Sequence, residues 1–218
     1  MPMVSSSGPR SRLSGSAWAL FRPDSAGSTL GPGGTLGGAQ AGVRAFYEPG
    51  PRGLALTVRL SAPLALRSGR EASAGVGIRG RAVGILLERR IALDDGARNA
   101  MSVTAYGGFN DVVLPHGLRA EGYGQIGIVG ARRRDAFADG AVRIVHPLSG
   151  AGTTRLAVGA ALSGGAQPGV TRVDVGPELI GIVSADQRPV RITAGWRQRI
   201  AGNAAPGSGP ALSVDIGF

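Results

Sequence analysis

The last seven residues of the chain alternate strictly between apolar and polar side chains. The apolar positions are Leu212, Val214, Ile216 and Phe218. An alternation of period two predicts a β-strand with one apolar face and one polar face. A bulky aromatic residue at the end of such a strand is typical of bacterial outer-membrane barrels, which carry aromatic residues at the lipid interface. We therefore predict that these four residues belong to the strand that closes a barrel.

The same alternation recurs along the chain in about twelve segments of roughly ten residues, each bounded by clusters of Gly, Pro, Asn or Asp. We expect strands at 13–22, 36–47, 53–62, 71–79, 82–91, 100–109, 118–129, 136–146, 154–163, 171–183, 190–200 and 211–218. An even number of strands places both ends of the barrel chain on the same side of the membrane. The predicted fold is therefore all-β, an antiparallel up-and-down transmembrane β-barrel of about 12 strands.

We assign residues 13–218 to this barrel and residues 1–12 to a disordered segment or a linker to a missing N-terminal part. The first twelve residues are polar and lack the apolar core of a secretory signal. No run of 18 apolar residues exists, which excludes a membrane-spanning helix. The chain contains 38 glycines, and each costs a helix interior about 1 kcal/mol relative to alanine, which argues against a helical bundle.

The chain is strongly basic, with a formal net charge of +10, and its 24 basic residues are all arginine. Such a charge favours a nucleic-acid partner when the basic residues form a patch. Here the arginines lie singly along the predicted strands, so we expect no nucleic-acid partner. The alternative is a soluble basic all-β module that binds nucleic acid or an acidic polymer and buries its apolar face in a sandwich. Aromatic residues make up only 5% of the chain, which is low for a sandwich core and favours an aliphatic surface against lipid.

The face opposite to the apolar one carries charges of both signs, as the polar lumen of a barrel does. The predicted pore-lining residues are Arg44, Arg59, Arg79, Glu88, Arg90, Arg119, Glu121, Asp139, Arg143, Arg155, Arg172, Asp174, Glu178, Arg191, Arg197, Arg199 and Asp215, with Glu71 on the same face. Arginines outnumber acids in this set, which favours anions in a conducting lumen. The oppositely charged pairs along single strands are Glu88 with Arg90, Arg119 with Glu121, Asp139 with Arg143, and Arg172 with Asp174. These pairs can hold neighbouring strands in register, or they can form a selectivity lining. The two roles are compatible with each other.

Arg132, Arg133 and Arg134 form the only run of basic residues. Because arginine binds phosphate in a bidentate manner, we predict that they contact lipopolysaccharide. A solvated hairpin is the alternative.

Aromatic residues also fall near predicted strand ends on the apolar face, where interfacial girdles lie. The alternative is that these aromatic residues belong to a core. These aromatic residues are Tyr47, Phe109, Trp196 and Phe218.

No motif in the chain predicts catalysis. Residues 122–127 match G-x-G-x-x-G, but a dinucleotide site requires a helix after the glycines, and the following sequence has no helical period. We interpret this stretch as a glycine-rich barrel strand. The two histidines, His116 and His146, lack the spacing of metal ligands, and neither is placed as the base of a triad. A barrel enzyme acting on lipid would need a Ser or His cluster at one rim. We therefore predict no metal, no cofactor and no enzymatic activity.

Six stretches of the chain are characteristic of one family. They are LGGAQAGVR at 36–44, ERRIALDDGARN at 88–99, RRRDAFADG at 132–140, GGAQPG at 164–169, VDVGP at 173–177 and WRQRIAGNAAPGSGP at 196–210. Together they resemble the C-terminal domain of bacteriophage adsorption protein A, the outer-membrane receptor of phage N-four, over roughly 13–218. The resemblance implies an outer-membrane barrel at the end of a longer protein with helical repeats. It also implies a link to surface polysaccharide export and use as a phage receptor, and it provides no catalytic residues.

We therefore expect an outer-membrane protein that acts as a passive conduit or anchor. Its expected partners are outer-membrane lipid and lipopolysaccharide, a surface glycan with its export machinery, and a phage tail protein.

Overall fold

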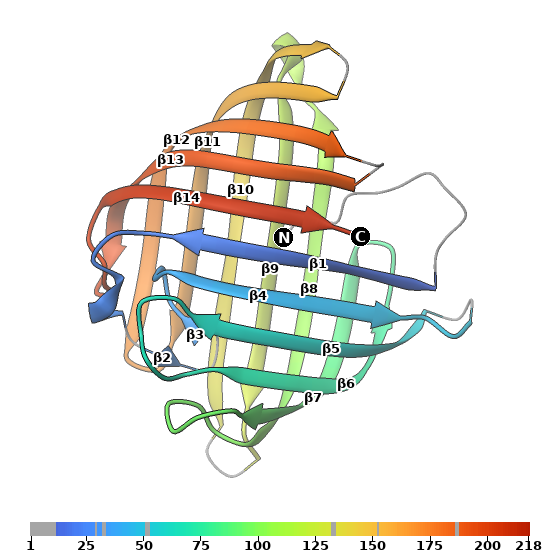
Figure 1. Ribbon diagram of the computed structural model, residues 1–218, viewed down its shortest axis with the longest axis vertical. Coiled ribbons are helices and arrows are strands. Elements are labelled where there is room, and N and C mark those ends of the chain that lie inside the picture. Colours follow the sequence, from blue (N-terminus) through green and yellow to red (C-terminus); the bar gives the residue numbers. More distant parts are fainter. Residues whose placement is uncertain are drawn as a thin grey trace.

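The computed structural model describes residues 12–28, 30–31, 34–50, 53–131, 134–151, 153–185 and 188–218. Within these residues, twelve antiparallel strands form one closed barrel, in which β14 returns to pair with β1 (Figure 1). The barrel strands are β1 (Leu13–Phe21), β4 (Gln40–Tyr47), β5 (Leu54–Pro63), β6 (Glu71–Arg79), β7 (Val83–Ala92), β8 (Ala100–Val113), β9 (Arg119–Val129), β10 (Asp135–Ala151), β11 (Thr154–Gln167), β12 (Val170–Ala185), β13 (Arg188–Gly202) and β14 (Gly209–Gly217). The prediction of an all-β up-and-down barrel is confirmed.

The seam between the first and last strands is closed as far as Phe218. In this seam, Ser16 of β1 pairs with Gly217 of β14. The Gly15 N–H donates to the Phe218 carbonyl at 2.7 Å, and the Phe218 N–H donates to the Gly15 carbonyl at 3.0 Å. The Phe218 ring lies over Gly15, where a Cβ atom would approach the ring carbon Cζ to 2.4 Å. Gly15 therefore leaves the notch that the aromatic ring occupies.

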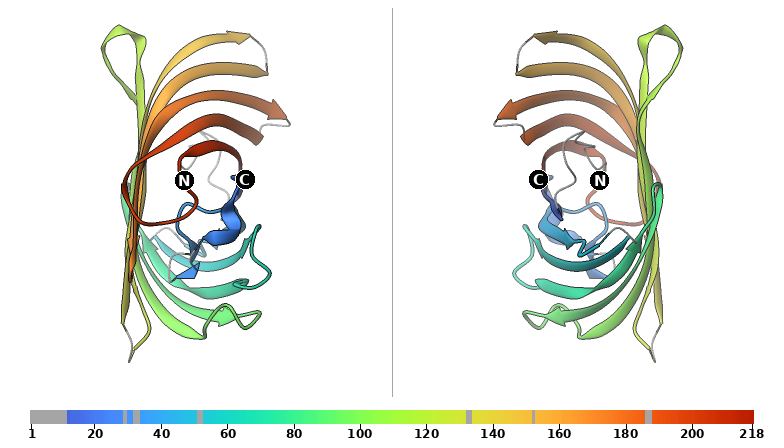
Figure 2. Two further views of the ribbon diagram at one scale, coloured as in Figure 1. Left: turned by 90° about the vertical axis from the view of Figure 1, so that its left-hand side faces the viewer. Right: turned by 90° about the vertical axis from the view of Figure 1, so that its right-hand side faces the viewer.

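The barrel wall is strongly tilted and uneven in height. Strands β14, β1, β4 and β5 at the front of Figure 1 cross strands β8–β11 at the back, as strand tilts of roughly 35–45° require. Figure 2 shows that β8–β11 form a flatter side of the barrel, and that the other strands curve to close the rest of the wall. The strands also differ in length around the wall, since β10 has 17 residues and β4 has 8.

Side chains alternate between the two sides of the wall, with the apolar side facing outward. Leu54, Ile78 and Ile126 are 50%, 64% and 63% exposed on this outer face. The inward-facing Glu88 and Asp174 are only 3% and 2% exposed. Hydrocarbon requires an apolar outer face and a closed hydrogen-bond ladder, whereas a soluble sandwich would bury its aliphatic side chains. The alternative of a soluble basic module is therefore not favoured.

Two small apolar clusters interrupt the polar interior. In the first, Tyr106 packs against Phe46, Ala55 and Leu86. The second contains Ala100, Val129 and Phe137. Both clusters lie on β4–β10.

The connections differ in length between the two ends of the barrel, which we call the loop end and the terminus end. The terminus end carries Leu13 and Phe218, together with the connections that follow β4, β6, β8, β10 and β12. The loop end carries the connections that follow β1, β5, β7, β9, β11 and β13, of which the connection from β1 to β4 is the longest. Outer-membrane barrels have their longer loops on the extracellular side, and the loop end has this character.

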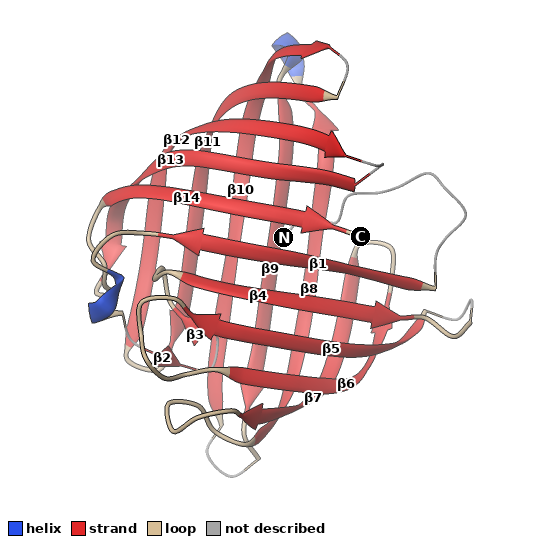
Figure 3. Cartoon of the chain, in the orientation of Figure 1, coloured by secondary structure: helices blue, strands red, loops and turns tan. Residues whose placement is uncertain are grey.

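The β1–β4 connection contains a helical turn, η1 (Ser25–Gly27), and a hairpin of β2 (Leu30–Gly31) and β3 (Gly34–Thr35). A second helical turn, η2 (Pro115–Gly117), joins β8 to β9 (Figure 3). In the described part of the chain, neither turn is long enough to cross a bilayer as a helix. The predicted strand at 36–47 begins only at Gln40, because residues 36–39 belong to the connection.

Candidate functional site

The interior of the barrel is a cavity of about 2520 Å³ that reaches from Arg12 and Glu48 at the terminus end to Leu36 and Gly165 at the loop end. The predicted pore-lining residues on its wall are Arg44, Arg59, Arg79, Arg90, Arg119, Glu121, Asp139, Arg143, Arg155, Arg172, Asp174, Arg191, Arg197 and Asp215. The other three bind groups around it: Glu88 accepts from Arg44, Glu178 accepts from Arg143, and Arg199 donates to the Ala204 carbonyl. The strict alternation of the strands brings these charged groups together.

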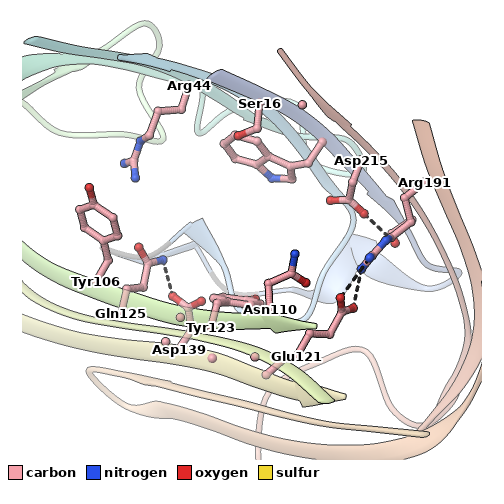
Figure 4. A pocket seen from close by; sticks show the side chains of 18 of the residues that line it. Ser16, Arg44, Tyr106, Asn110, Glu121, Tyr123, Gln125, Asp139, Arg191 and Asp215 are labelled. Atoms are coloured by element: carbon pink, nitrogen blue, oxygen red, sulfur yellow. Dashed lines mark hydrogen bonds and ion pairs between the residues drawn. The ribbon is translucent and has the colours of Figure 1, made fainter. Parts of the chain in front are cut away.

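Two arginines and two glutamates form a cluster that we call the matched cluster. Arg143 donates to Glu121 at 2.7 Å and also to Glu178. Arg191 donates to both carboxylate oxygens of Glu121, at 3.0 Å for Oε2. Because β13 and β9 are not neighbours in the sheet, the contact between Arg191 and Glu121 crosses the cavity (Figure 4). β11 presents alanine and glycine opposite Arg143 and Glu178, which leaves room for the two side chains to meet over it.

Among the described residues, the predicted pairing along one strand is seen for Arg172 and Asp174. In the other cases the residues bind elsewhere. Glu88 binds Arg44, Arg90 binds Glu71, and Arg119 binds Asp111. Glu121 binds Arg143 and Arg191, Asp139 binds Gln125, and Arg143 binds Glu121 and Glu178. Residues two apart on one strand are separated by roughly 6–7 Å, whereas opposite residues on neighbouring strands are about 5 Å apart. Charged side chains therefore bind across strands more readily than along one strand.

Three arginines stand in one row across β4, β5 and β7, and we call them the arginine row. Arg44 pairs directly with Arg59, and a serine on β6 separates Arg59 from Arg90. Arg59 and Arg90 both donate to Glu71 at 2.7 Å. Arg44 reaches Glu88 only at 3.5 Å. Three cations of the row therefore share two carboxylates.

The arginine row has unused hydrogen-bond donors. Like charges directly opposite each other on neighbouring strands destabilise a sheet, and Arg44 and Arg59 are such a pair. The Nε atoms of both are buried without a hydrogen-bond partner among the described residues. Each side chain nevertheless keeps 16% of its surface exposed, and both line the cavity.

An aromatic pair lies beside the row. The ring centroids of Phe46 and Tyr106 are 6.4 Å apart. The guanidinium carbon of Arg79 lies 4.4 Å from the Phe46 centroid and that of Arg44 lies 6.0 Å from it, within the range of cation–π attraction. The Tyr106 hydroxyl has no hydrogen-bond acceptor among the described residues, and Figure 4 shows it pointing toward the same part of the cavity as Arg44.

Two cavity acids form no ion pair within the described part of the chain. Asp139 accepts a hydrogen bond from Gln125 at 2.6 Å, and Asp215 accepts one from Ser213 at 3.3 Å. Arg155 lines the cavity as well and forms no ion pair with any described acid. The cavity wall thus offers groups of both signs to a solute, in addition to those bound to each other.

Charged groups fasten the β1–β4 connection into the loop end of the barrel, and we call Arg22, Arg172 and Asp174 the latch. Arg22 lies 3.7 Å from Asp174 and donates to the carbonyls of Gly37 and Gly207 at 3.0 and 2.9 Å. Arg172 binds the same carboxylate and donates to carbonyls of the β13–β14 connection. Burial, together with the nearby Arg172, lowers the pKa of Arg22 to about 10. The latch therefore joins the β1–β4 connection, the β13–β14 connection and β12.

The latched connection crosses to the opposite wall. Leu36 lies against Gly165 of β11, where a Cβ atom would approach the Leu36 Cδ1 atom to 2.4 Å. Thr35, Leu36 and Gln40 line the cavity, and Figure 2 shows the segment between β1 and β4 within the outline of the barrel. The connection therefore narrows the loop end of the cavity.

Among the described residues, the others that the sequence singled out do not gather at one place. Arg132 and Arg133 lie outside the described residues, and Arg134 is exposed at the loop end. His116 lies in η2, His146 is exposed on β10, and residues 122–127 lie within β9. The described residues contain no group of three or more His, Cys, Asp or Glu that could hold a metal ion. The four predicted girdle residues are all exposed, and they are Tyr47, Phe109, Trp196 and Phe218.

The sequence did not predict the roles of Arg22 and Tyr106 or the inward path of the connection at Leu36. Arg22 and Leu36 belong to a glycine-rich connection without periodicity, and no local signal gives its direction. Tyr106 carries a detectable signal, because it falls on the polar face of its strand, opposite to the outward-facing Val103 and Met101. An aromatic residue at such a position indicates an interior ring.

No family model matches the chain, and no curated protein is similar to it in sequence. Among solved structures, the chain is similar to a bacterial polysaccharide outer membrane secretin, with a TM-score of 0.44 and 8% identity over 94% of this chain and 97% of that chain. It is similar to LpxR from Salmonella typhimurium, with a TM-score of 0.45 and 8% identity over 94% of this chain and 99% of that one. It is also similar to OmpT, an outer membrane protein of Vibrio cholerae, with a TM-score of 0.31 and 9% identity over 94% and 98%.

The architecture itself defines the class of protein. The wall is closed and wholly antiparallel, its outer face is aliphatic and its interior is ionic. Only such a closed ladder satisfies every backbone group of a sheet in hydrocarbon. The chain is an outer-membrane β-barrel protein, and its location is the outer membrane.

Proposed function

We propose that this barrel is a passive conduit that favours anions. The observation that supports the proposal is the excess of arginines over acids on the cavity wall. A ring of charge in a low-dielectric wall raises the local concentration of the opposite ion and sets the selectivity of a pore. Two cavity cations are only weakly balanced by acids: Arg44 reaches Glu88 only at 3.5 Å, and Arg197 forms no ion pair with any described acid.

The test is single-channel recording in planar bilayers with the purified, folded barrel. We expect small ohmic steps and, in a potassium chloride gradient, a reversal potential displaced toward the chloride equilibrium potential. A reversal potential displaced toward potassium would overturn the preference for anions. Absence of any conductance would overturn the conduit and leave the role of an anchor.

We further propose that the solute is a surface polysaccharide and that the barrel serves its export. The cavity carries hydrogen-bonding groups such as Gln125, Tyr123 and Asp139, which suit the hydroxyls of a sugar chain, beside the arginines. The test is deletion of the chain in its own host, followed by measurement of cell-surface and periplasmic glycan. Loss from the surface with accumulation in the periplasm is the expected result, and an unchanged distribution would overturn this role.

The exposed connections of the loop end are proposed as a surface that phage tail proteins can use, with lipopolysaccharide beside them. Arg134 is exposed there, next to two further arginines in the sequence. Phage adsorption to cells with and without the chain tests the receptor role, and neutralising Arg132, Arg133 and Arg134 tests the lipopolysaccharide contact. Unchanged adsorption or unchanged lipopolysaccharide binding would overturn the respective role. We propose no catalytic activity for the chain.

A further inference from the structure

We propose that Arg44 and Arg59 form a binding site for an oxyanion, the phosphate, sulfate or carboxylate group of an acidic solute. This inference deepens the proposed function, since it places a specific anion site in the conduit. It depends on three features of the arginine row, which are the register of its strands, the shortage of acids and the unused donors.

The register places the two arginine side chains next to each other. Arg44 and Arg59 are directly opposite each other on β4 and β5 and project from the same face of the wall. Opposite residues on antiparallel strands have Cβ atoms about 5 Å apart, and two cations at that spacing destabilise the pair unless an anion lies between them. A sheet whose only requirement was stability would place an acid at one of the two positions.

The acids nearby do not satisfy the row. Glu71 is shared between Arg59 and Arg90, and Glu88 is also bound by the Ser73 hydroxyl at 3.2 Å. Glu88 lies 3.5 Å from Arg44, which is too long for a strong charge-assisted bond. One positive charge of the row is therefore left for a further anion.

Three buried polar groups in and beside the row also remain without partners in the described part of the chain. Among the described residues, the buried Nε–H groups of Arg44 and Arg59 have no acceptor, and the Tyr106 hydroxyl has none either. A buried donor without an acceptor costs about 1–3 kcal/mol. The exposed parts of both arginine side chains face the cavity, so a solute can reach them. Guanidinium groups bind oxyanions by two parallel N–H bonds, which suits phosphate, sulfate and carboxylate alike.

The test is isothermal titration of the folded barrel in detergent with inorganic phosphate, sodium sulfate and sodium glucuronate, and with sodium chloride as the reference anion. We expect saturable binding of an oxyanion and none of chloride in the same range. The three anions distinguish a phosphoryl, a sulfate and a carboxylate source for the group. If none of them binds more tightly than chloride, the proposal is overturned.

The variant R44Q/R59Q is expected to weaken oxyanion binding by about tenfold or more, because it removes both bidentate donors. R155Q is the matched control, since Arg155 also lines the cavity and carries the same charge without belonging to the row. It should bind within about twofold of the wild type, as distant sites usually do not couple. Equal losses in both variants would overturn the site in favour of diffuse lumen charge, and unchanged binding in R44Q/R59Q would overturn it outright.

Folding of each variant is checked by gel migration with and without boiling. If R44Q/R59Q does not fold, R44K/R59K retains the charges and loses the bidentate geometry. The proposal then requires weaker phosphate binding by R44K/R59K than by the wild type, and equal binding would overturn it. Titration needs no membrane potential, so its outcome is independent of conductance. If the barrel conducts but binds no oxyanion, only the proposed oxyanion site is overturned. If it binds oxyanions but does not conduct, only the proposed conduit function is overturned.

Discussion

The matched cluster and the arginine row are built from the same residue types on the same barrel, and they differ in how charge is balanced. In the matched cluster, Arg143 and Arg191 bind Glu121, and Arg143 also binds Glu178, so two cations meet two anions. In the row, three cations meet two anions, and two of them stand directly opposite each other. The matched cluster connects strands across the cavity, whereas the arginine row keeps a positive charge that can bind an anion. The difference shows that an ionic lumen can hold a structural and a functional region side by side.

The largest expected effect comes from breaking the matched cluster at Glu121. Because E121Q leaves Arg191 facing a neutral amide and Arg143 with Glu178 alone, we expect the free energy of unfolding to fall by about 3 kcal/mol. The measurement is a urea titration scored by the migration of unboiled samples on a gel. E48Q is the control, because the Glu48 side chain is 36% exposed and its ion pair with Arg79 should contribute less than about 1 kcal/mol. A loss below about 1 kcal/mol in E121Q would remove the structural role of the cluster.

Opening the latch should raise the single-channel conductance. R172Q removes the bonds from Arg172 to Asp174 and to the β13–β14 connection. We expect the β1–β4 connection to leave the loop end and the single-channel conductance to rise by about twofold or more, since the narrowest part of a pore limits flow. R155Q, which leaves the latch intact, should conduct close to the wild type. Equal conductance of R172Q and the wild type would show that the connection does not limit flow.

Removing one cation from the arginine row should have a small effect of opposite sign. R44Q relieves the like-charge pair with Arg59, so we expect the free energy of unfolding to stay the same or to rise by up to about 1 kcal/mol. The same urea titration measures it. A loss of more than about 2 kcal/mol would place Arg44 with the structural residues of the matched cluster.

The smallest effect concerns a half-buried carboxylate outside the lumen. Asp94, in the β7–β8 connection, accepts N–H bonds from Gly69, Arg70 and Gly96 at 2.5, 3.0 and 3.1 Å. These bonds, that from Gly69 above all, hold the pKa of Asp94 well below its ordinary value. A lowered pKa in the folded state means that the stabilisation is complete above the ordinary value of about 3.9 and is lost only as the pH falls below it.

Hydrogen exchange at the Gly69 and Arg70 amides tests this point. We expect protection, corrected for the intrinsic exchange rate, to persist at pH 4 and to decline below it. D94N should show low protection that does not vary with pH. Protection that declined already between pH 6 and pH 5 would contradict the lowered pKa.

The wall of the barrel was predictable from sequence because period-two alternation is a local signal. Leu54 and Ile78 face outward as their alternation indicates, and Glu121 and Asp174 face inward. The partners of the charges were not predictable, because binding across strands depends on register and on which intervening residues are small. Arg143 reaches Glu178 over the short residues of β11, and no spacing along one strand indicates this contact. The latch at Arg22 depends on a tertiary path that the glycine-rich connection does not encode locally.

The space above Gly15 favours the correct register between the first and last strands of the barrel. A slip of one residue in the seam would turn every side chain of β14 to the wrong side of the wall. The Phe218 ring would then meet a neighbouring serine of β1 instead of the empty space above a glycine. Misjoined ends would thus be rejected by steric collision at a single rim position.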